Sequence, residues 1–358
     1  MAFKDLERVL YNDSIKLDYK DKLHRYYARE RVNWELPTED PKAWSKIIYP
    51  KGTTTLLGDT LEKKGLMQWP KNVALRELFG FYGEFTGDNG NKVPAGFSKD
   101  VGTMWSSKEK DSFDGQQRIH PLVQKDLLPY LQSANTAWQR KQKKGADIGN
   151  VVHDSIEHYI RQNPNNEDMP EFNETFDIAE QYLWNIKEEE YESDAMRDKA
   201  LTEFDSDVAQ ATLAFEQFKK WWDEERPKLV GAEDLVYSKE HNVAGTFDAL
   251  IRINGKLVIC DWKTSSAYGD APEGVSYDYF IQSAIYAMAY MEMGGEQIED
   301  CCIVSARKDG GFGLVFASEL GLSMDELLSW AKSVIMCYGL ADKTKKALKE
   351  HAKPEEVK

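Results

Sequence analysis

Two apolar runs joined by Asn254-Gly255 strongly limit the folds that this chain can adopt. Residues 243–253 and 256–263 are mostly apolar, and an Asn-Gly pair between two such runs is the strongest short-range signal for a hairpin. Residues 232–237 form a third run of the same kind directly before them. We therefore expect three strands here, of which the last two form a hairpin.

Helical and strand patterns alternate around this hairpin. The segment 171–225 predicts two long helices, acidic on their outer faces, because its apolar residues recur at helical spacing. The segments after the hairpin predict, in order, a helix over 277–293, strands over 300–306 and 313–316, and a helix over 323–340 that begins at a capping box of Ser323 and Glu326. This order predicts an α/β fold with a mixed sheet.

The first part of the chain divides less clearly. We predict a helix over 14–31, and two further helices over 127–144 and 148–162, with the boundary at Gly145. The region 85–120 is rich in Gly, Ser, Lys and Asp and predicts a loop. The expected organisation is a mainly helical N-terminal accessory region (1–130) with a loop-rich insertion near 85–120, a core (131–342) and a charged C-terminal tail (343–358).

The net charge of −15 constrains the partners of the chain. A protein that holds nucleic acid by bulk electrostatics should be basic, so any such contact needs a local basic strip or metal ions at an acidic centre.

No apolar run reaches the roughly 18 residues that a membrane helix needs, and no secretory signal or transit peptide is visible. The four cysteines form no C-x-x-C pair. We expect an intracellular, cytoplasmic protein with reduced cysteines.

The residues with the clearest chemical meaning lie on the hairpin. Side chains alternate along a strand, so Asp261 and Lys263 point to one side and Trp262 to the other. Asp248 lies on the preceding strand, where a pairing register could bring it beside Asp261. Two such carboxylates repel each other unless a divalent cation lies between them. A lysine beside them suits the activation of a metal-bound water, or the stabilisation of charge on a pentavalent phosphate.

A structural explanation of the same residues stays open at this point. Asp261 could simply end a buried strand, with Lys263 solvated after it, although burying a carboxylate unpaired is costly. Gln282 and Tyr286 share one face of the helix over 277–293, and packing on the sheet does not require Gln282. A lone histidine on a helix, such as His153, is more often structural than a ligand.

Taken together, these residues resemble the PD-(D/E)XK nucleases, specifically the RecB-type exonuclease branch. Five elements of that branch's pattern occur in order between about residues 130 and 340: Gly149 with His153, Glu233, Gly245-Thr246-Phe247-Asp248, Asp261-Trp262-Lys263-Thr264, and Gln282 with Tyr286. Upstream, residues 53–57 and 65–69 are similar to the entry segment of phage-encoded exonucleases and of the mitochondrial genome maintenance exonuclease.

The resemblance implies a restriction-endonuclease-like core and a set of roles. His153, Asp248, Asp261 and the main-chain carbonyl of Trp262 would bind Mg²⁺ or Mn²⁺. Lys263 would be the catalytic lysine, Gln282 and Tyr286 would position the strand or the lysine, and Glu233 would complete or support the site, with Glu240 as an alternative on the same stretch. No cysteine precedes Cys260, so we expect no iron–sulfur cluster. No Walker A pattern occurs, so we expect no motor within the chain.

The expected DNA contacts lie before the His153 helix and after the D-x-K motif. They comprise Arg140, Lys141, Lys143, Lys144 and Thr264. The basic cluster is equally typical of a solvated helix end, where positive charge suits the helix dipole. Trp138 and Tyr268 could stack on unpaired bases. The acidic helices over 171–225 would keep duplex at a distance and favour a single strand or an end.

The function that these features indicate is a metal-dependent deoxyribonuclease, and specifically an exonuclease that hydrolyses DNA phosphodiester bonds through a metal-activated water. It would serve DNA recombination, replication or degradation, with replication or recombination proteins as partners, in the host cytoplasm if a phage encodes it. Three alternatives remain: a non-catalytic DNA-end-binding module of the same fold, a structure-specific or sequence-specific endonuclease, and a non-nuclease enzyme with a fortuitous D-x-K.

Overall fold

The computed structural model describes part of the chain. It describes side chains at residues 5–20, 23–61, 142–162, 164, 177–181, 198, 201–265 and 275–351, and the backbone alone at 85–86, 92–93, 121–141 and the rest of 194–200. The chain divides into two compact units, Met1–Glu62 with Asp147–Lys358, and Lys63–Ala146. The central sheet and the candidate site described below belong to the first unit.

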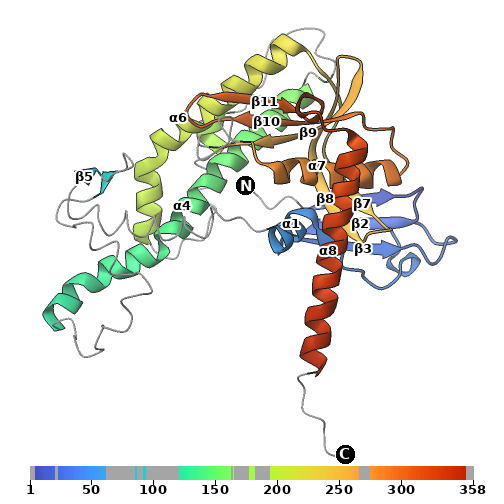
Figure 1. Cartoon of the computed structure of the whole chain (residues 1–358), viewed down its shortest axis with the longest axis horizontal. Coiled ribbons are helices and arrows are strands. Elements are labelled where there is room, and N and C mark those ends of the chain that lie inside the picture. The colour runs from blue at the N-terminus through green and yellow to red at the C-terminus, as the bar shows by residue number, and fades with distance from the viewer. Residues whose placement is uncertain are drawn as a thin grey trace, which may run out of the picture. The chain divides into compact units, whose positions relative to one another are not determined.

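A mixed six-stranded sheet forms the centre of this unit (Figure 1). Its strands run in the order β11-β10-β9-β8-β4, and β7 pairs with the other edge of β8. Their bounds are β4 (Lys51–Gly52), β7 (Lys228–Ser238), β8 (Val243–Ile253), β9 (Lys256–Lys263), β10 (Asp300–Ala306) and β11 (Phe312–Phe316). The β9–β10 and β4–β8 pairs are parallel and the others antiparallel. The predicted α/β fold with a mixed sheet, which matches a restriction-endonuclease-like core, is confirmed.

The predicted hairpin is confirmed by both its ladder and its turn. β8 and β9 pair from Ala249↔Cys260 to Ile253↔Lys256. Asn254 and Gly255 have φ values of 52° and 80°. Positive φ at both central residues is what a type I′ turn requires, and Asn and Gly adopt it at little cost.

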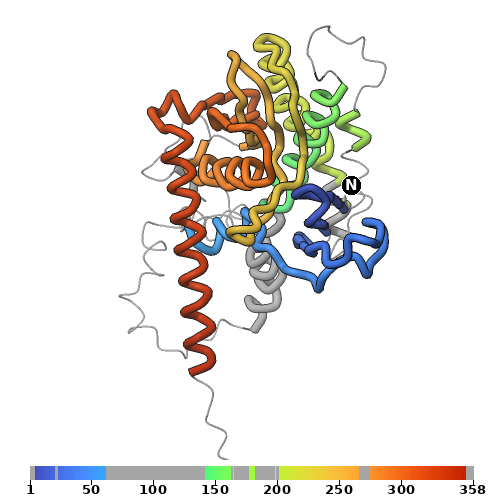
Figure 2. The backbone as a smooth tube through the Cα atoms, turned by 90° about the vertical axis from the view of Figure 1, so that its right-hand side faces the viewer, coloured from blue at the N-terminus to red at the C-terminus, as the bar shows by residue number. Residues whose placement is uncertain are grey.

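Helices cover both faces of the sheet (Figures 1 and 2). One face packs against α1 (Thr53–Thr60), α7 (Tyr277–Glu292) and α8 (Met324–His351), through residues such as Leu56, Ile259 and Ile285. The other packs against α6 (Asp194–Glu225) and the last turns of α4 (Pro121–Gln162), through residues such as Phe218 and Trp262. Ile259 and Trp262 lie in different clusters because neighbouring side chains alternate along β9.

The N-terminal residues contradict the prediction for this region. The segment 14–31 is not a helix but two strands, β2 (Ile15–Lys20) and β3 (Arg25–Glu30), which form an antiparallel sheet with β1 (Leu6–Leu10). Ile15 and Leu17 are fully buried while Lys16 between them is not, which is the period-two pattern of a strand. The helix predicted over 14–31 is therefore wrong, and the start of the N-terminal region is a three-stranded sheet.

The other helices follow the prediction with shifted boundaries. α4 is one continuous helix through Gly145, where two helices were predicted; an interior glycine costs only about 1 kcal/mol relative to alanine. α6 corresponds to the second helix of the segment 171–225, whereas most of the first lies outside the described residues. α8 continues to His351, and the predicted capping box at its start is confirmed, since Ser323 and Glu326 bond reciprocally.

Two further predictions concern residues that the structure describes only in part. The region 85–120 contains the short pair β5 (Phe85–Thr86) and β6 (Lys92–Val93), and its remainder lies outside the described residues. Within the described part of the chain, no helix has the length and apolarity needed to cross a membrane.

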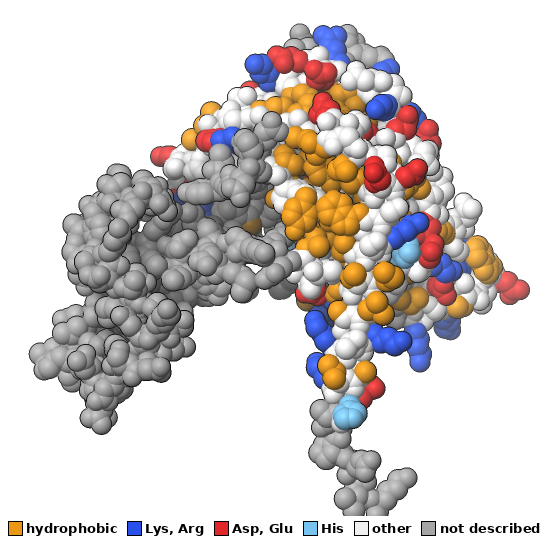
Figure 3. Space-filling model, viewed as in Figure 1, with side chains coloured by type: hydrophobic (Ala, Val, Ile, Leu, Met, Phe, Trp, Pro, Cys, Tyr) orange, Lys and Arg blue, Asp and Glu red, His pale blue; other side chains and the backbone are white. Residues whose placement is uncertain are grey.

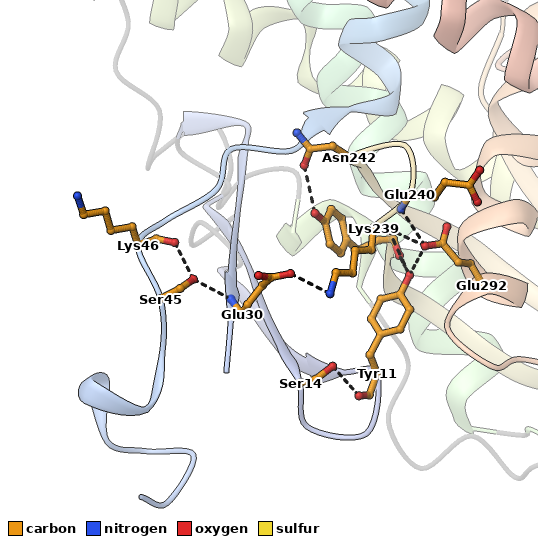
Figure 4. Close-up of polar contacts among 10 residues, drawn as sticks. Tyr11, Ser14, Glu30, Ser45, Lys46, Lys239, Glu240, Asn242 and Glu292 are labelled. Atoms are coloured by element: carbon orange, nitrogen blue, oxygen red, sulfur yellow. Dashed lines mark hydrogen bonds and ion pairs between the residues drawn. The ribbon is translucent and has the colours of Figure 1, made fainter. Parts of the chain in front are cut away.

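A group of polar contacts around Tyr11 bonds the β1–β3 sheet to the core (Figure 4). The hydroxyl of Tyr11 lies 2.8 Å from the carbonyl oxygen of Tyr237 and 2.9 Å from Oε1 of Glu292, at the end of α7. Lys239 also forms an ion pair with Glu30 of β3 at 2.8 Å. These contacts join elements more than two hundred residues apart in the chain.

Candidate active site

The candidate site lies where the edge of β8 has no strand beside it. On that edge β4 pairs with Val243 and Ala244, and β9 pairs from Ala249 onward. The four residues between them, Gly245–Asp248, face a gap in the sheet, while β7 continues along the opposite edge. This gap exposes the predicted G-T-x-D segment to side chains from neighbouring helices.

The side chain of Asp248 forms the hydrogen bond to β9 that the backbone ladder lacks at this point. Its Oδ2 accepts a hydrogen bond from the backbone N–H of Trp262 at 2.6 Å. Burial raises the pKa of Asp248, whereas the charge of Lys263 and the Trp262 N–H act to lower it. The carboxylate therefore holds the end of β9 close to β8 without a strand-to-strand hydrogen bond.

The alternation of side chains breaks at the same point. Phe247 packs in the cluster beneath α7 and Ala249 in the cluster beneath α4 and α6, although residues two apart on a regular strand share a face. Opposite Asp248 on β7 lies Glu233, which has a φ of 49°, an unusual value for a non-glycine residue. Backbone outliers of this kind cluster at functional sites.

Asp261 and Lys263 form a buried ion pair beside Asp248. Asp261 is 1% exposed, and Nζ of Lys263 lies 2.6 Å from its Oδ2. Burial raises the pKa of Asp261 to about 6, against the lowering effect of Lys263. Burial acts to lower the pKa of Lys263, but the two carboxylates outweigh it and the pKa is raised. Lys263 is therefore a cation at neutral pH.

His153 approaches these carboxylates from α4. Its Nδ1 lies 4.0 Å from Oδ1 of Asp248, and Val151 and Val152, which precede it on α4, are fully buried against the sheet. Burial and the charge of Lys263 lower the pKa of His153 to about 4, although Asp261 and a hydrogen bond to the backbone of Trp262 act to raise it. The ring is neutral at pH 7, which is the form that binds metal ions.

The glycine of the G-x-x-x-H pattern has a packing role. A β-carbon placed on Gly149 would lie 2.8 Å from Oγ1 of Thr264, the residue that follows β9. Glycine thus permits the close approach of α4 to the D-x-K-T segment that carries Asp261 and Lys263.

Gln282 and Tyr286 reach the site from α7. Nε2 of Gln282 donates a hydrogen bond to the hydroxyl of Tyr286 at 2.8 Å. The ring of Tyr286 is 4% exposed and lies against Gly245, where a β-carbon would overlap it. Burial raises the pKa of Tyr286 well above its ordinary value, so the hydroxyl stays protonated.

The donor set fits a divalent metal ion. Ligand atoms of His153, Glu233 and Asp248 all lie within 4.8 Å of one another. Apart from the ion pair with Lys263, neither carboxylate oxygen of Asp261 accepts a hydrogen bond from a described residue, although both are buried. A buried carboxylate with so few partners is costly unless a further cation satisfies it. Oxygen donors with one nitrogen suit Mg²⁺ and, somewhat better, Mn²⁺.

The structure thus brings most of the predicted catalytic and metal-binding residues together. Glu233 joins the cluster, whereas its alternative Glu240 lies in the turn after β7 with a side chain 75% exposed. The roles assigned to these residues, including the Trp262 carbonyl, stay predictions.

The structure describes fewer of the residues that were predicted to contact DNA. Lys143 and Lys144 belong to the second unit, and the side chains of Arg140, Lys141 and Trp138, together with all of Tyr268, lie outside the described residues. Thr264 is described, in its place against Gly149. These assignments also stay predictions.

Sequence reasoning missed Tyr279. Nζ of Lys263 lies 4.9 Å from the centroid of the Tyr279 ring, whose face attracts the positive charge. Tyr279 precedes Gln282 by three residues on α7, so the two share one helix face. This three-residue spacing is the sequence signal from which a place for Tyr279 at the site could have been predicted.

Comparison with known proteins gives one family. The model of the PD-(D/E)XK nuclease superfamily matches residues 127–320, more than half of the chain. No curated protein gives a significant match.

Solved structures give distant similarities. One is a candidate exonuclease from Eubacterium rectale, with 13% identity over 52% of this chain and a TM-score of 0.31; the chain covers 63%, less than two thirds, of that protein. Another is the protein SSO0001, with 16% identity, coverage of 52% of this chain and 84% of that one, and a TM-score of 0.24.

Proposed function

This chain belongs to the PD-(D/E)XK nuclease superfamily, and we propose that it is a metal-dependent deoxyribonuclease of the RecB-type branch that acts as an exonuclease. Membership of the superfamily implies a nucleic-acid substrate and hydrolysis of phosphodiester bonds, and its members generally use divalent metal ions. The choice of DNA, the attack on ends and the branch are the proposal.

The observation that carries the proposal is the environment of Asp261. Its carboxylate is buried, and its one polar partner among the described residues is the Lys263 ammonium, 2.6 Å away. A cation shared with Asp248 would offset the cost of burying both carboxylates. We assign Asp248, Asp261 and His153 as metal ligands, with Glu233 and the Trp262 carbonyl completing the set.

Residues of this chain place a positive charge beside the phosphate and position the groups around it. A divalent ion bound there would polarise a phosphate oxygen and lower the pKa of the attacking water. Lys263 places a fixed positive charge where negative charge develops on the phosphate, and it is held there by Asp261 and the Tyr279 ring. Gln282 and Tyr286 act as positioning residues through their mutual hydrogen bond.

The assignment to the RecB-type branch rests on two contacts. Gly149, from the G-x-x-x-H element, lies against Thr264 of the D-x-K-T element. Tyr286, from the Q-x-x-x-Y element, lies against Gly245 of the G-T-x-D element. These contacts join four of the five elements, and Glu233, the fifth, lies with His153 and Asp248. Together they support one site, and we infer a role in DNA recombination, replication or degradation.

Cleavage of end-labelled and closed circular DNA tests the proposal. Single-stranded and duplex forms of each would be incubated with Mg²⁺, Mn²⁺ or EDTA, using the wild type, Lys263→Ala and Lys332→Ala. Lys332 is an exposed lysine of α8 outside the site and provides the matched control. We expect cleavage of linear DNA alone by the wild type and the control, and none in EDTA or with Lys263→Ala.

Other results would redirect the assignment. Cleavage of circles would identify an endonuclease. Binding of DNA ends without cleavage in either metal would identify a non-catalytic end-binding module, and preferential cleavage of labelled RNA would overturn the choice of DNA.

A further inference from the structure

A second feature of the first unit is an open cavity of about 700 Å³ where β3, β4 and α8 meet. Its walls carry Arg25 of β3, Lys51 of β4 and Lys346 of α8, together with His241. Asp342 is the one acidic residue among those that line it. Figure 3 shows Lys and Arg side chains on both sides of the lower half of α8. In a chain with a net charge of −15, this local excess of cations is unexpected.

These cations are weakly engaged within the protein. Lys346 pairs with Asp342 at 2.8 Å, but both side chains are largely exposed, and such surface pairs contribute little. Lys51 lies 5.2 Å from the centre of the Tyr338 ring and 3.8 Å from Asp59. Arg25 is exposed and makes no ion pair or hydrogen bond through its side chain to any residue that the structure describes. The three charges therefore remain available to an anionic ligand.

The cavity connects to the candidate active site along β8. Val243 lines the cavity and precedes Asp248 by five residues, which is about 17 Å at the ~3.4 Å rise of a strand. Tyr26, another lining residue, places its hydroxyl 3.4 Å from Oγ1 of Thr246, between those two positions. Nucleotides follow one another at ~3.4 Å in a stacked strand, so about five steps span this distance.

We propose that this cavity is a second nucleic-acid subsite, which holds backbone phosphates of the substrate strand about five nucleotides from the bond that is cut. The proposal rests on the nuclease function proposed above. Arg25, Lys51 and Lys346 neutralise the phosphates. Tyr49 lines the same cavity and is 63% exposed, so its ring is available to stack on a base.

Binding of fluorescein-labelled single-stranded DNA, measured by anisotropy in EDTA, tests the subsite without requiring cleavage. Arg25→Glu and Lys346→Glu would be compared with Lys332→Glu, which makes the same charge change on α8 outside the cavity. For strands longer than about ten nucleotides we expect Kd to rise at least about tenfold in the first two variants, with a salt dependence weaker by about one phosphate contact.

The outcomes separate this proposal from the previous one. Equal Kd values for the cavity variants and Lys332→Glu on long strands would overturn the subsite, even if the wild type cleaves DNA. Loss of long-strand binding in the cavity variants, in a protein that cleaves nothing with either metal, would sustain the subsite and overturn the nuclease. Circular dichroism and the neutral variants Arg25→Gln and Lys346→Gln, expected to give an intermediate loss, separate misfolding from lost charge.

Discussion

Oδ2 of Asp248 accepts the backbone N–H of Trp262 at 2.6 Å, where the ladder between β8 and β9 ends. Continued by one pair, the register Ala249↔Cys260 would place Asp248 opposite Asp261. The carboxylate replaces that pair, so the two acidic residues meet at an opening in the sheet and not within a closed ladder. A gap of this kind leaves room for His153, which comes from α4, and for Lys263 of β9, which lies against Tyr279 of α7.

The proposed metal site predicts stabilisation by divalent cations. A ligand that binds only the folded state stabilises it by about 2.7 kcal/mol at a concentration 100 times its Kd. We expect Mg²⁺ or Mn²⁺ to raise the melting temperature of the wild type in differential scanning calorimetry, and EDTA to reverse the rise. Asp261→Asn should lose this response, because it removes a charged ligand.

Asp325→Asn provides the control, since Asp325 is an exposed acid at the start of α8. It should respond to the cations as the wild type does. An equal rise in Asp261→Asn would show that the cations act elsewhere.

The contact between Gly245 and Tyr286 predicts a cost for any β-carbon at position 245. In Gly245→Ala the added carbon would overlap Cε1 of the Tyr286 ring. Overpacking of this kind typically costs about 1–3 kcal/mol. We expect urea unfolding to show a loss in this range, accompanied by reduced cleavage.

Gly58→Ala is the matched substitution. Gly58 lies within α1, and a β-carbon added there would have nothing within 4 Å of it. Alanine is favoured over glycine in a helix by about 0.5–1 kcal/mol, so this variant should be slightly more stable than the wild type. A neutral Gly245→Ala would mean that α7 moves aside at no cost.

Gly149 and Thr264 are predicted to be energetically coupled. Alanine at position 149 should gain about 1 kcal/mol of helix propensity, but its β-carbon would press on Thr264 Oγ1. Gly149→Ala should therefore be neutral or destabilising in the wild type and stabilising in the Thr264→Ala background. A double-mutant cycle measured by urea unfolding gives the coupling energy. Additive effects of the two substitutions would mean that the contact with Thr264 is not what requires glycine at position 149.

Glu292 predicts a dependence of stability on pH. Burial raises the pKa of Glu292, but hydrogen bonds from Ser238, Tyr11 and the backbone N–H groups of Glu240 and Lys239 outweigh it, so the folded-state pKa is lowered. A lowered folded pKa contributes stability that is present above the unfolded value of 4.5 and lost as the pH falls through the folded value. Glu292→Gln should therefore melt below the wild type at pH 7, and the difference should shrink below pH 4.5.

Glu296→Gln serves as the reference for this experiment, since Glu296 is exposed and pairs only with Arg252 among the residues that the structure describes. It should change the melting temperature little at either pH. A Glu292→Gln deficit that persists undiminished in acid would indicate that lost packing, and not charge, is responsible.

Local sequence information was sufficient to predict the hairpin and the sides of β9 on which its residues lie. Asn254-Gly255 specifies its turn through backbone conformation alone, and period-two alternation places Asp261 and Lys263 opposite Trp262. The end of α7 at Glu292 and the capping box at Ser323 also depend on residues within one or two turns. In such cases neighbouring residues carry the energies that decide the conformation.

Local patterns failed where distant residues decide the conformation. The segment 14–31 carries charges and aromatic residues at spacings compatible with a helix, yet Ile15 and Leu17 become buried only because β1 and β3 pair with β2 against the core. The same holds for the short strand β4, whose two residues pair with β8 nearly two hundred positions away. No short window of sequence contains the partner that stabilises these strands.

Neighbouring residues were thus enough to predict the hairpin, the sides of β9 on which Asp261, Trp262 and Lys263 lie, and the residue types suited to a metal ion. Contacts between distant elements bring Glu233 to Asp248, place Tyr279 over Lys263, and form the basic cavity of β3, β4 and α8. The range of the interactions explains this difference. Backbone propensity and alternation act between neighbours, whereas burial, ion pairing and close packing act between elements that the chain brings together only when it folds.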